Sequence, residues 1–356
     1  MEDFCDLNKA RSMKFFNILN HDREFAMIDI CKFIMAFVVI AIHTNPVVNC
    51  TDHLVVRSVV IIEKWAVPFF FIASGFFLFY NKKYYDSLQK QRIDKYLKKI
   101  IVLYCVWTLL SFPLTLYGYI QSDNSLIECV FSYIKYFLFV GKLYNSYHLW
   151  YLLALIYAVV MIQFMLKRKC KMGQMVIVSV LLYSINEFLQ YIINHLQNSS
   201  SMMYKVAALY QYIFNNGGVF IGMIYVAIGM VIAKHRKYLN RWICISAIVI
   251  LNFLESYCNP IVVDYLKIIE TTLVFMVMLS IEIKNNMKYK FLRKASTIIY
   301  LSHLIWYSVY TFIIIKEPNK LGLDSFIVTS VLSFVNAVIL IGLMKNRKLE
   351  WIKKIT

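Results

Sequence analysis

The sequence predicts an all-α fold, a polytopic membrane bundle of about ten transmembrane helices with both termini in the cytoplasm. Three observations support this fold class: 60% of the 356 residues are hydrophobic, only 16% are charged, and the charged residues cluster between long apolar runs. Soluble domains carry about 25% charged residues. The composition therefore excludes a disordered chain and an ordinary cytosolic enzyme.

A membrane-spanning helix needs roughly 20 predominantly apolar residues. Applied along the chain, this length gives ten candidate spans: 25–44, 59–80, 100–120, 148–166, 175–193, 213–233, 242–258, 261–283, 295–315 and 325–344. A further apolar segment, 129–140, is too short to cross the bilayer, so we expect it to be an interfacial or re-entrant piece.

Most of the 38 lysines and arginines lie in the N-terminal segment, in alternate loops and in the C-terminal tail. Because cytoplasmic loops are enriched in these residues, both termini are assigned to the cytoplasm. We expect one membrane domain over 25–344, preceded by a cytoplasmic segment 1–24 and followed by a basic tail 345–356. The N-terminal segment has charges of both signs and no small-residue cleavage site, so we do not expect it to be a removable signal peptide.

The formal net charge of +18 follows from this topology, so membrane lipid is the expected partner and nucleic acid is not. The eight cysteines form no C-x-x-C pair, which gives no indication of a disulfide framework or a metal site. No P-loop, H-E-x-x-H or G-x-S-x-G element occurs. Nucleotide hydrolysis, zinc proteolysis and serine-hydrolase chemistry therefore find no support.

The first span carries Asp29, Lys32 and His43, and ionisable residues inside a bilayer mark candidate functional sites. Lys32 and His43 are eleven positions apart, about 16 Å along one helical face at about 1.5 Å per residue. Asp29 shares that face at i,i+3 from Lys32. The face fits one wall of a polar passage in which a neutral His43 accepts a proton. An interfacial Asp29–Lys32 pair and a hydrogen-bonded His43 explain the pattern equally well.

Polar groups in the second and fourth spans also have structural explanations. Ser74 and Gly75 follow Pro68, and such residues in membrane helices usually serve a kink or close packing. His148 and Trp150 open the fourth span, where an interfacial aromatic anchor is the simpler interpretation.

His303 lies in the middle of its span, where a hydrogen bond to another helix is as good an explanation as catalysis. The basic loop before the third span contains Arg92, Lys95 and Lys98. These cations serve either membrane orientation and lipid attraction, or the binding of a phosphorylated ligand.

Four segments, in order along the chain, resemble the motifs of the membrane acyltransferase-3 family. IDICKFIMAFVVIAIHTNP carries the family's basic residue, ten intervening residues and histidine, here Lys32 and His43. AVPFFFIASGFFL is similar to the family's second-helix signature, and HLWYL and ASTIIYLSH resemble its later histidine motifs. The family often has Arg in place of Lys32, and Arg-x-x-Arg where Lys95-x-x-Lys98 stands.

AIHTNP and AVPFFF are also similar to the membrane half of vancomycin-resistance serine racemases, whose racemase domain we do not expect here.

This resemblance implies transfer of an acyl group, usually acetyl, from cytoplasmic acyl-CoA to a hydroxyl of a carbohydrate or cell-wall component outside a bacterial cytoplasmic membrane. It implies His43 as the base and Lys32 as a donor-side cation fixed by Asp29. The donor phosphates would be held by basic residues that include Lys32, Lys95, Lys98 and Arg92. The acceptor side would be shaped by His148, Trp150, His303, Ser74 and Asn45.

Two other function classes stay open on the residues alone. Embedded acids (Glu187, Glu255 and Glu270) suit a transporter or flippase for an amino acid, a sugar or a lipid-linked glycan. A sensor or assembly partner would keep the fold without the chemistry. A homo-oligomer is compatible with either class and with an acyltransferase.

Overall fold

The computed structural model describes residues 25–80, 87–195, 201–215, 218–235, 240–284 and 287–346. Within these ranges the chain is helical, with one isolated β-bridge and no strand, so the predicted all-α class is confirmed. The expected segment 1–24 and most of the expected tail 345–356 lie outside the described residues.

The α-helices are α2 Ala26–Thr44, α3 His53–Phe79, α4 Ser87–Ile120, α5 Leu126–Lys135, α6 Trp150–Lys167, α7 Met172–His195, α8 Met202–Phe214, α9 Gly218–His235, α10 Arg241–Leu254, α11 Pro260–Leu279, α12 Met287–Ser308 and α13 Leu323–Leu343. Two π-helical turns, η1 Tyr136–Val140 and η4 Val309–Ile314, extend α5 and α12. Two 3₁₀ turns, η2 Tyr147–Leu149 and η3 Glu255–Tyr257, precede α6 and follow α10.

Each of the ten predicted spans coincides with a helix, and seven of the described helical segments are long and apolar enough to cross a membrane. The other three are α9, α10 and α11. Helix α10 has only 14 residues, and α11 carries the charged residues Asp264, Lys267 and Glu270 along its length. The described residues therefore contain seven candidate membrane-spanning helices, whereas the count of ten and the side of each terminus stay predictions.

The short apolar segment predicted at 129–140 is the end of α5 followed by η1. Ser125 caps α5 in a capping box with Glu128, and the hydrogen bonds from Ser125 lower the pKa of the Glu128 carboxyl. Helix α5 has no buried residue, which agrees with a peripheral position. The sequence did not predict the equally short helix α8.

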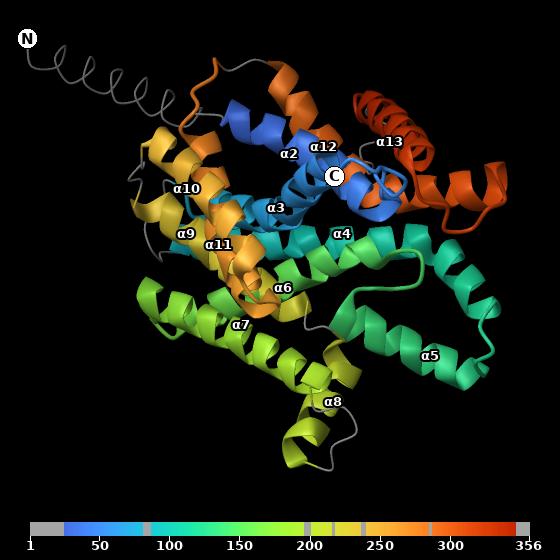
Figure 1. Cartoon of the computed structure of the whole chain (residues 1–356), viewed down its shortest axis with the longest axis horizontal. Helices are drawn as coiled ribbons and strands as arrows, with labels where there is room; N and C mark the ends of the chain where they lie inside the picture. The colour runs from blue at the N-terminus through green and yellow to red at the C-terminus, as the bar shows by residue number, and fades with distance from the viewer. Residues whose placement is uncertain are drawn as a thin grey trace, which may run out of the picture.

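Helix α3 lies at the centre of the bundle and packs against α2, α9 and α11. In Figure 1, α2, α12 and α13 gather on one side of α3, and α7 and α8 lie on the other. Small residues allow the closest approach: a Cβ on Gly75 would lie 2.1 Å from a backbone carbonyl of α9, and one on Gly229 would lie 2.1 Å from a carbonyl of α3. The structural interpretation of Gly75 is therefore confirmed, since only glycine fits.

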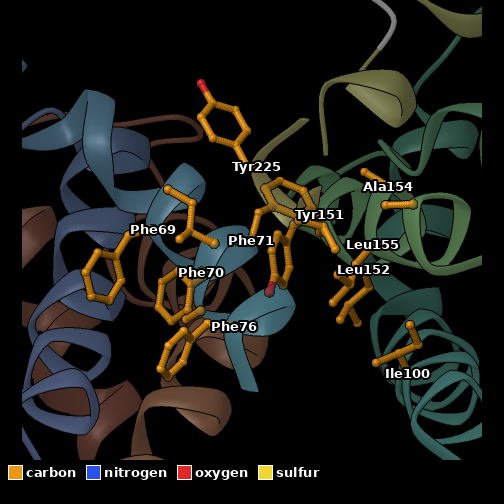
Figure 2. Packing of buried hydrophobic residues seen from close by; sticks show 14 of the residues in the cluster. Phe69, Phe70, Phe71, Phe76, Ile100, Tyr151, Leu152, Ala154, Leu155 and Tyr225 are labelled. Atoms are coloured by element: carbon orange, nitrogen blue, oxygen red, sulfur yellow. The ribbon is translucent and has the colours of Figure 1, made fainter. Parts of the chain in front are cut away.

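Aromatic side chains fill the space around α3. Figure 2 shows Phe69, Phe70, Phe71 and Phe76 of α3 near Tyr151 of α6, with Tyr225 of α9 above them. The Phe71 and Tyr151 rings are 4.5 Å apart. This layer separates two cavities, which are described below.

Candidate functional site

The structure brings together the three histidines that the sequence motifs singled out. His43 lies in the last turn of α2, His148 in η2, and His303 in α12. The His43 and His303 rings stack at 5.2 Å with an interplanar angle of 16°. The His148 ring lies 4.9 Å from that of His303. Three distant segments therefore form one histidine cluster.

Backbone carbonyls determine which nitrogens of two of these rings carry a proton. His303 Nδ1 lies 2.6 Å from the Tyr300 carbonyl oxygen, and His148 Nε2 lies 3.0 Å from that of Leu301. Because a carbonyl oxygen only accepts hydrogen bonds, each of these nitrogens is the donor. The opposite nitrogens, His303 Nε2 and His148 Nδ1, have no hydrogen-bond partner within the described residues. Both are free to accept a proton or a hydrogen bond.

His43 is the most exposed member of the cluster. Its side chain is partly exposed, whereas His148 is 1% and His303 0% exposed. Tyr147 packs edge-on against the His43 ring at 5.0 Å. No hydrogen bond between His43 and another described side chain occurs, so the ring is held by aromatic contacts and its nitrogens remain available to a substrate.

A cavity of about 240 Å³ lies on the predicted cytoplasmic side of the cluster. Its cationic lining residues are Lys32 of α2, Lys99 of α4 and Arg293 of α12. The Lys32 ammonium also lies 4.7 Å from the centre of the Phe77 ring. Three cations from three helices give the cavity a positive potential suited to an anionic ligand.

The expected donor-side residues Arg92, Lys95 and Lys98 do not line this cavity, and their part in donor binding stays a prediction. Lys95 and Lys98 are exposed and do not line the cavity. Arg92 donates from Nη2 to the Phe77 carbonyl oxygen at 2.8 Å, which fixes α4 against α3. Instead, Lys99 and Tyr96 of the same helix line the cavity. Lys99 lies one helical turn after both Lys95 and Tyr96 and is exposed, as Lys95 and Lys98 are; it differs from these two lysines in lining the cavity.

Asp29 forms its ion pair with Arg293, and it also interacts electrostatically with Lys32. Its carboxylate is buried and accepts three hydrogen bonds from Arg293, from Nε at 2.9 and 3.0 Å and from Nη2 at 2.6 Å. A guanidinium presents a rigid, planar pair of N–H donors that matches the two carboxylate oxygens, a geometry that the ammonium of Lys32 lacks. Asp29 therefore ties α2 to α12 and positions Arg293 at the cavity.

Tyr300 stands between the cavity and the histidine cluster. Its ring lines the cavity and lies 6.0 Å from the rings of both His148 and His303. Its hydroxyl donates to the His148 carbonyl oxygen at 2.8 Å. The cavity lining includes Lys32 but none of the three histidines. The expected passage from Lys32 to His43 is thus interrupted by Tyr300.

Ser74, Asn45 and Trp150 take no part in the ring contacts of the histidine cluster. Ser74 lines the cavity near Tyr151, whose hydroxyl is 3.2 Å from Ser74 Oγ, and Ser74 Oγ donates to the Phe70 carbonyl. Asn45 ends α2 in the left-handed conformation, with φ 41°. Trp150 lines a second, larger cavity. Of the residues expected on the acceptor side, only His148 and His303 therefore belong to the histidine cluster.

Within the part of the chain that the structure describes, no group of three or more His, Cys, Asp and Glu side chains is arranged to hold a metal ion. The three rings stack and cross edge to face, which suits van der Waals contact and hydrogen bonding.

The fold and the site define an integral membrane protein with a histidine cluster above a cationic cavity. The family described as an acyltransferase domain, membrane acyltransferase-3, matches residues 25–343, so the chain belongs to this acyltransferase family. The family resemblance inferred from the four motifs is therefore confirmed.

Similar proteins include three racemases from enterococci. An amino-acid racemase of Enterococcus faecalis is 28% identical over 225 residues, which cover 62% of this chain and 30% of the relative. A second amino-acid racemase of that species is 34% identical over 144 residues, 39% of this chain and 19% of the relative. A serine/alanine racemase of Enterococcus gallinarum is 33% identical over 134 residues, 36% of this chain and 18% of the relative.

This chain therefore spans less than a third of the length of these relatives. No solved structure matches the chain.

Proposed function

We propose that this membrane acyltransferase is an O-acyltransferase. It moves an acyl group, acetyl in the simplest case, from cytoplasmic acyl-CoA to a hydroxyl of an extracytoplasmic carbohydrate or cell-wall component. Its place would be the cytoplasmic membrane of a bacterium. The observation that carries the proposal is the joining of His43, His148 and His303 into one cluster, next to a cavity that opens toward Lys32.

The donor is the first partner to account for. Coenzyme A thioesters carry phosphates and a thin, uncharged pantetheine arm. Lys32, Lys99 and Arg293 supply positive charge at the cavity, and the planar Arg293 fork is suited to bidentate phosphate binding. Tyr96, Tyr151 and Ser74 continue the lining toward Tyr300 with groups able to hydrogen-bond the amides of the arm.

The Tyr300 ring lies between the donor cavity and the proposed base, His43. For the thioester to reach His43, the Tyr300 ring has to turn, which breaks one hydrogen bond to the His148 carbonyl. The net cost of one such bond is about 1 kcal/mol, so binding of the donor arm is sufficient to move the ring. The same ring, when closed, keeps water away from the thioester.

The proposed acyl transfer is a single displacement. His43 removes the proton from the acceptor hydroxyl as its oxygen attacks the thioester carbon. The bond from carbon to sulfur breaks, and the proton on His43 passes to the departing thiolate to give free CoA. His303 stacks on His43 and holds its ring in place, so His303 is a positioning residue.

The direct test uses purified protein in lipid nanodiscs with acetyl-CoA and soluble cell-wall glycan fragments. We expect CoA release that depends on the acceptor, and His43→Gln should lower the rate by about a hundredfold or more. His53→Gln is the matched control, because His53 is exposed at the start of α3. Full activity of His43→Gln would remove His43 from the mechanism. Mass spectrometry of surface glycans with and without the protein should show the loss of one acyl increment.

A transporter or flippase is the second candidate, supported by a cavity of about 740 Å³ that is separate from the donor cavity. Its acidic and basic lining would suit a polar cargo. The two functions are distinguished by uptake measurements on proteoliposomes without any acyl donor. Saturable uptake under those conditions would favour transport over acyl transfer.

A further inference from the structure

The large cavity of about 740 Å³ lies on the predicted outer side of the protein, among α3, α7, α9 and α11. The aromatic layer of Phe71 and Tyr151 separates it from the donor cavity (Figure 2). Its volume is in the range of small-molecule sites. Its lining shares no residue with that of the donor cavity.

One wall of this cavity carries two carboxylates, Glu187 of α7 and Asp264 of α11. They interact electrostatically with each other and with the ammonium of Lys267. Neither forms an ion pair with a described residue, although Glu187 accepts a hydrogen bond from Asn186 at 3.0 Å. The whole lining carries Glu63, Glu187 and Asp264 against Lys64, Lys142 and Lys267. Because Lys64 is paired with Glu255 and Glu270, the three carboxylates of the lining face only two other lysines.

Tyr225 gives an independent sign that this wall is built for a ligand. It lines the cavity and is only 2% exposed, and within the described residues no hydrogen bond to its hydroxyl is formed. Figure 2 shows the hydroxyl pointing away from the phenylalanines of α3. The Tyr225 hydroxyl is not one of the buried polar atoms that are cut off from water, so it borders the open space of the cavity, where a ligand has room to hydrogen-bond it. The Tyr225 hydroxyl also lies within electrostatic reach of Asp264 and Glu187.

The other end of the cavity approaches the histidine cluster along the chain. Trp150 lines it and follows His148 by two residues, and Ile42 lines it directly before His43. Trp150 and Phe71 pack with their rings 6.1 Å apart. Flat aromatic faces are a common platform for the apolar face of a sugar ring. None of the three histidines lines this cavity, so the reacting hydroxyl of a ligand held at Glu187 and Asp264 would have to reach past Ile42 and Trp150 to the proposed base.

Building on the proposed acyl transfer, we propose that this cavity is the acceptor site and that it selects acceptors with a free ammonium group near the reacting hydroxyl. The ammonium would lie between Glu187 and Asp264, and Tyr225 would hydrogen-bond a hydroxyl of the same ligand. Such compounds include amino sugars with an unblocked amine and small amino alcohols. An N-acetylated acceptor would lose the charge and leave both carboxylates without a cation.

The test compares matched pairs of probes on the full chain in nanodiscs: glucosamine against N-acetylglucosamine, and ethanolamine against N-acetylethanolamine. Binding is measured by equilibrium dialysis with labelled probe. We expect each free amine to bind at least about tenfold more tightly than its acetylated partner, in line with a charge-assisted contact. A preference for glucosamine over ethanolamine would identify an amino sugar as the source of the amine, and the reverse order would identify an amino alcohol.

Two variants locate the binding. Asp264→Asn should weaken amine binding by about tenfold, and Tyr225→Phe should weaken it by about threefold or more while preserving the packing of the ring. The matched controls are Asp123→Asn and Tyr257→Phe, since both residues are exposed and outside the cavity. In turnover assays the two cavity variants should raise the KM for the acceptor and leave the KM for acetyl-CoA unchanged.

The outcomes separate this inference from the proposed function. Acyl transfer to acceptors without any preference for a free amine, or with amine binding unaffected by Asp264→Asn and Tyr225→Phe, would overturn the acceptor assignment and leave acyl transfer in place. Amine-selective binding without CoA release would support the ligand class and refute the acyltransferase function. The comparison of probe pairs on the unmodified protein needs no variant to fold.

Discussion

The buried carboxylate of Asp29 offers the sharpest prediction about how the donor cavity is assembled. Asp29 is 1% exposed and accepts three hydrogen bonds from Arg293, whose side chain is 45% exposed. Breaking a buried ion pair costs about 3–5 kcal/mol. Because Arg293 reaches water after the break, we expect the low end of that range, about 3 kcal/mol of unfolding free energy, for Asp29→Asn.

A double-mutant cycle separates the observed partner from the one expected from the sequence. The coupling energy between Asp29→Asn and Arg293→Gln should be about 2 kcal/mol, whereas that between Asp29→Asn and Lys32→Gln should be below about 0.5 kcal/mol. The assay is reversible unfolding in mixed micelles with increasing SDS, followed by circular dichroism. A coupling of Asp29 to Lys32 as large as that to Arg293 would refute this account of the cavity.

Three further predictions follow from single contacts. Gly75→Ala should destabilise the protein by about 1–3 kcal/mol, because the new Cβ meets a backbone carbonyl at 2.1 Å; the melting temperature checks this, with Gly173→Ala as the control in open space. Tyr300→Phe should increase CoA release without acceptor, because the ring loses the hydrogen bond that keeps it closed; an unchanged rate of hydrolysis would contradict the gating role. Lys99→Gln should raise the KM for acetyl-CoA by about tenfold, whereas Lys95→Gln should leave it within twofold of the starting value; equal effects would contradict the assignment of the lining.

The fold class was predictable because the bilayer imposes a simple rule. Every backbone polar group in lipid needs an internal partner, so long apolar runs become helices. This rule located a helix at each predicted span, including α9, α10 and α11. It did not predict α8, since a helix of 13 residues gives no span-length signal. The rule also says nothing about which helices are neighbours.

The candidate site was predictable one residue at a time and not as an arrangement. His43, His148 and His303 each stand in a recognisable motif, yet their stacking depends on how α2, η2 and α12 pack. Asp29 illustrates the limit of local reasoning: the i,i+3 spacing favours Lys32, but a guanidinium 264 positions away makes the better contact. Lys99 was missed because a charged loop and the first turns of a helix look alike in sequence.

Tyr300 shows why a passage is hard to predict from a sequence. The spacing of Lys32 and His43 places both on one face of α2, but the space between them is filled by a ring from α12. Whether a polar face lines an open path depends on the side chains that neighbouring helices contribute. The shape of a pocket depends on how several helices pack together, and the sequence of one helix does not give this information.

Transfer across the bilayer is the central claim, and right-side-out vesicles loaded with [¹⁴C]acetyl-CoA test it most directly. With acceptor present only outside, the account predicts labelled acceptor in the external medium, unlabelled CoA inside, and no transfer by His43→Gln. Label that leaves the vesicles as intact acetyl-CoA, or transfer that persists in His43→Gln, would contradict it.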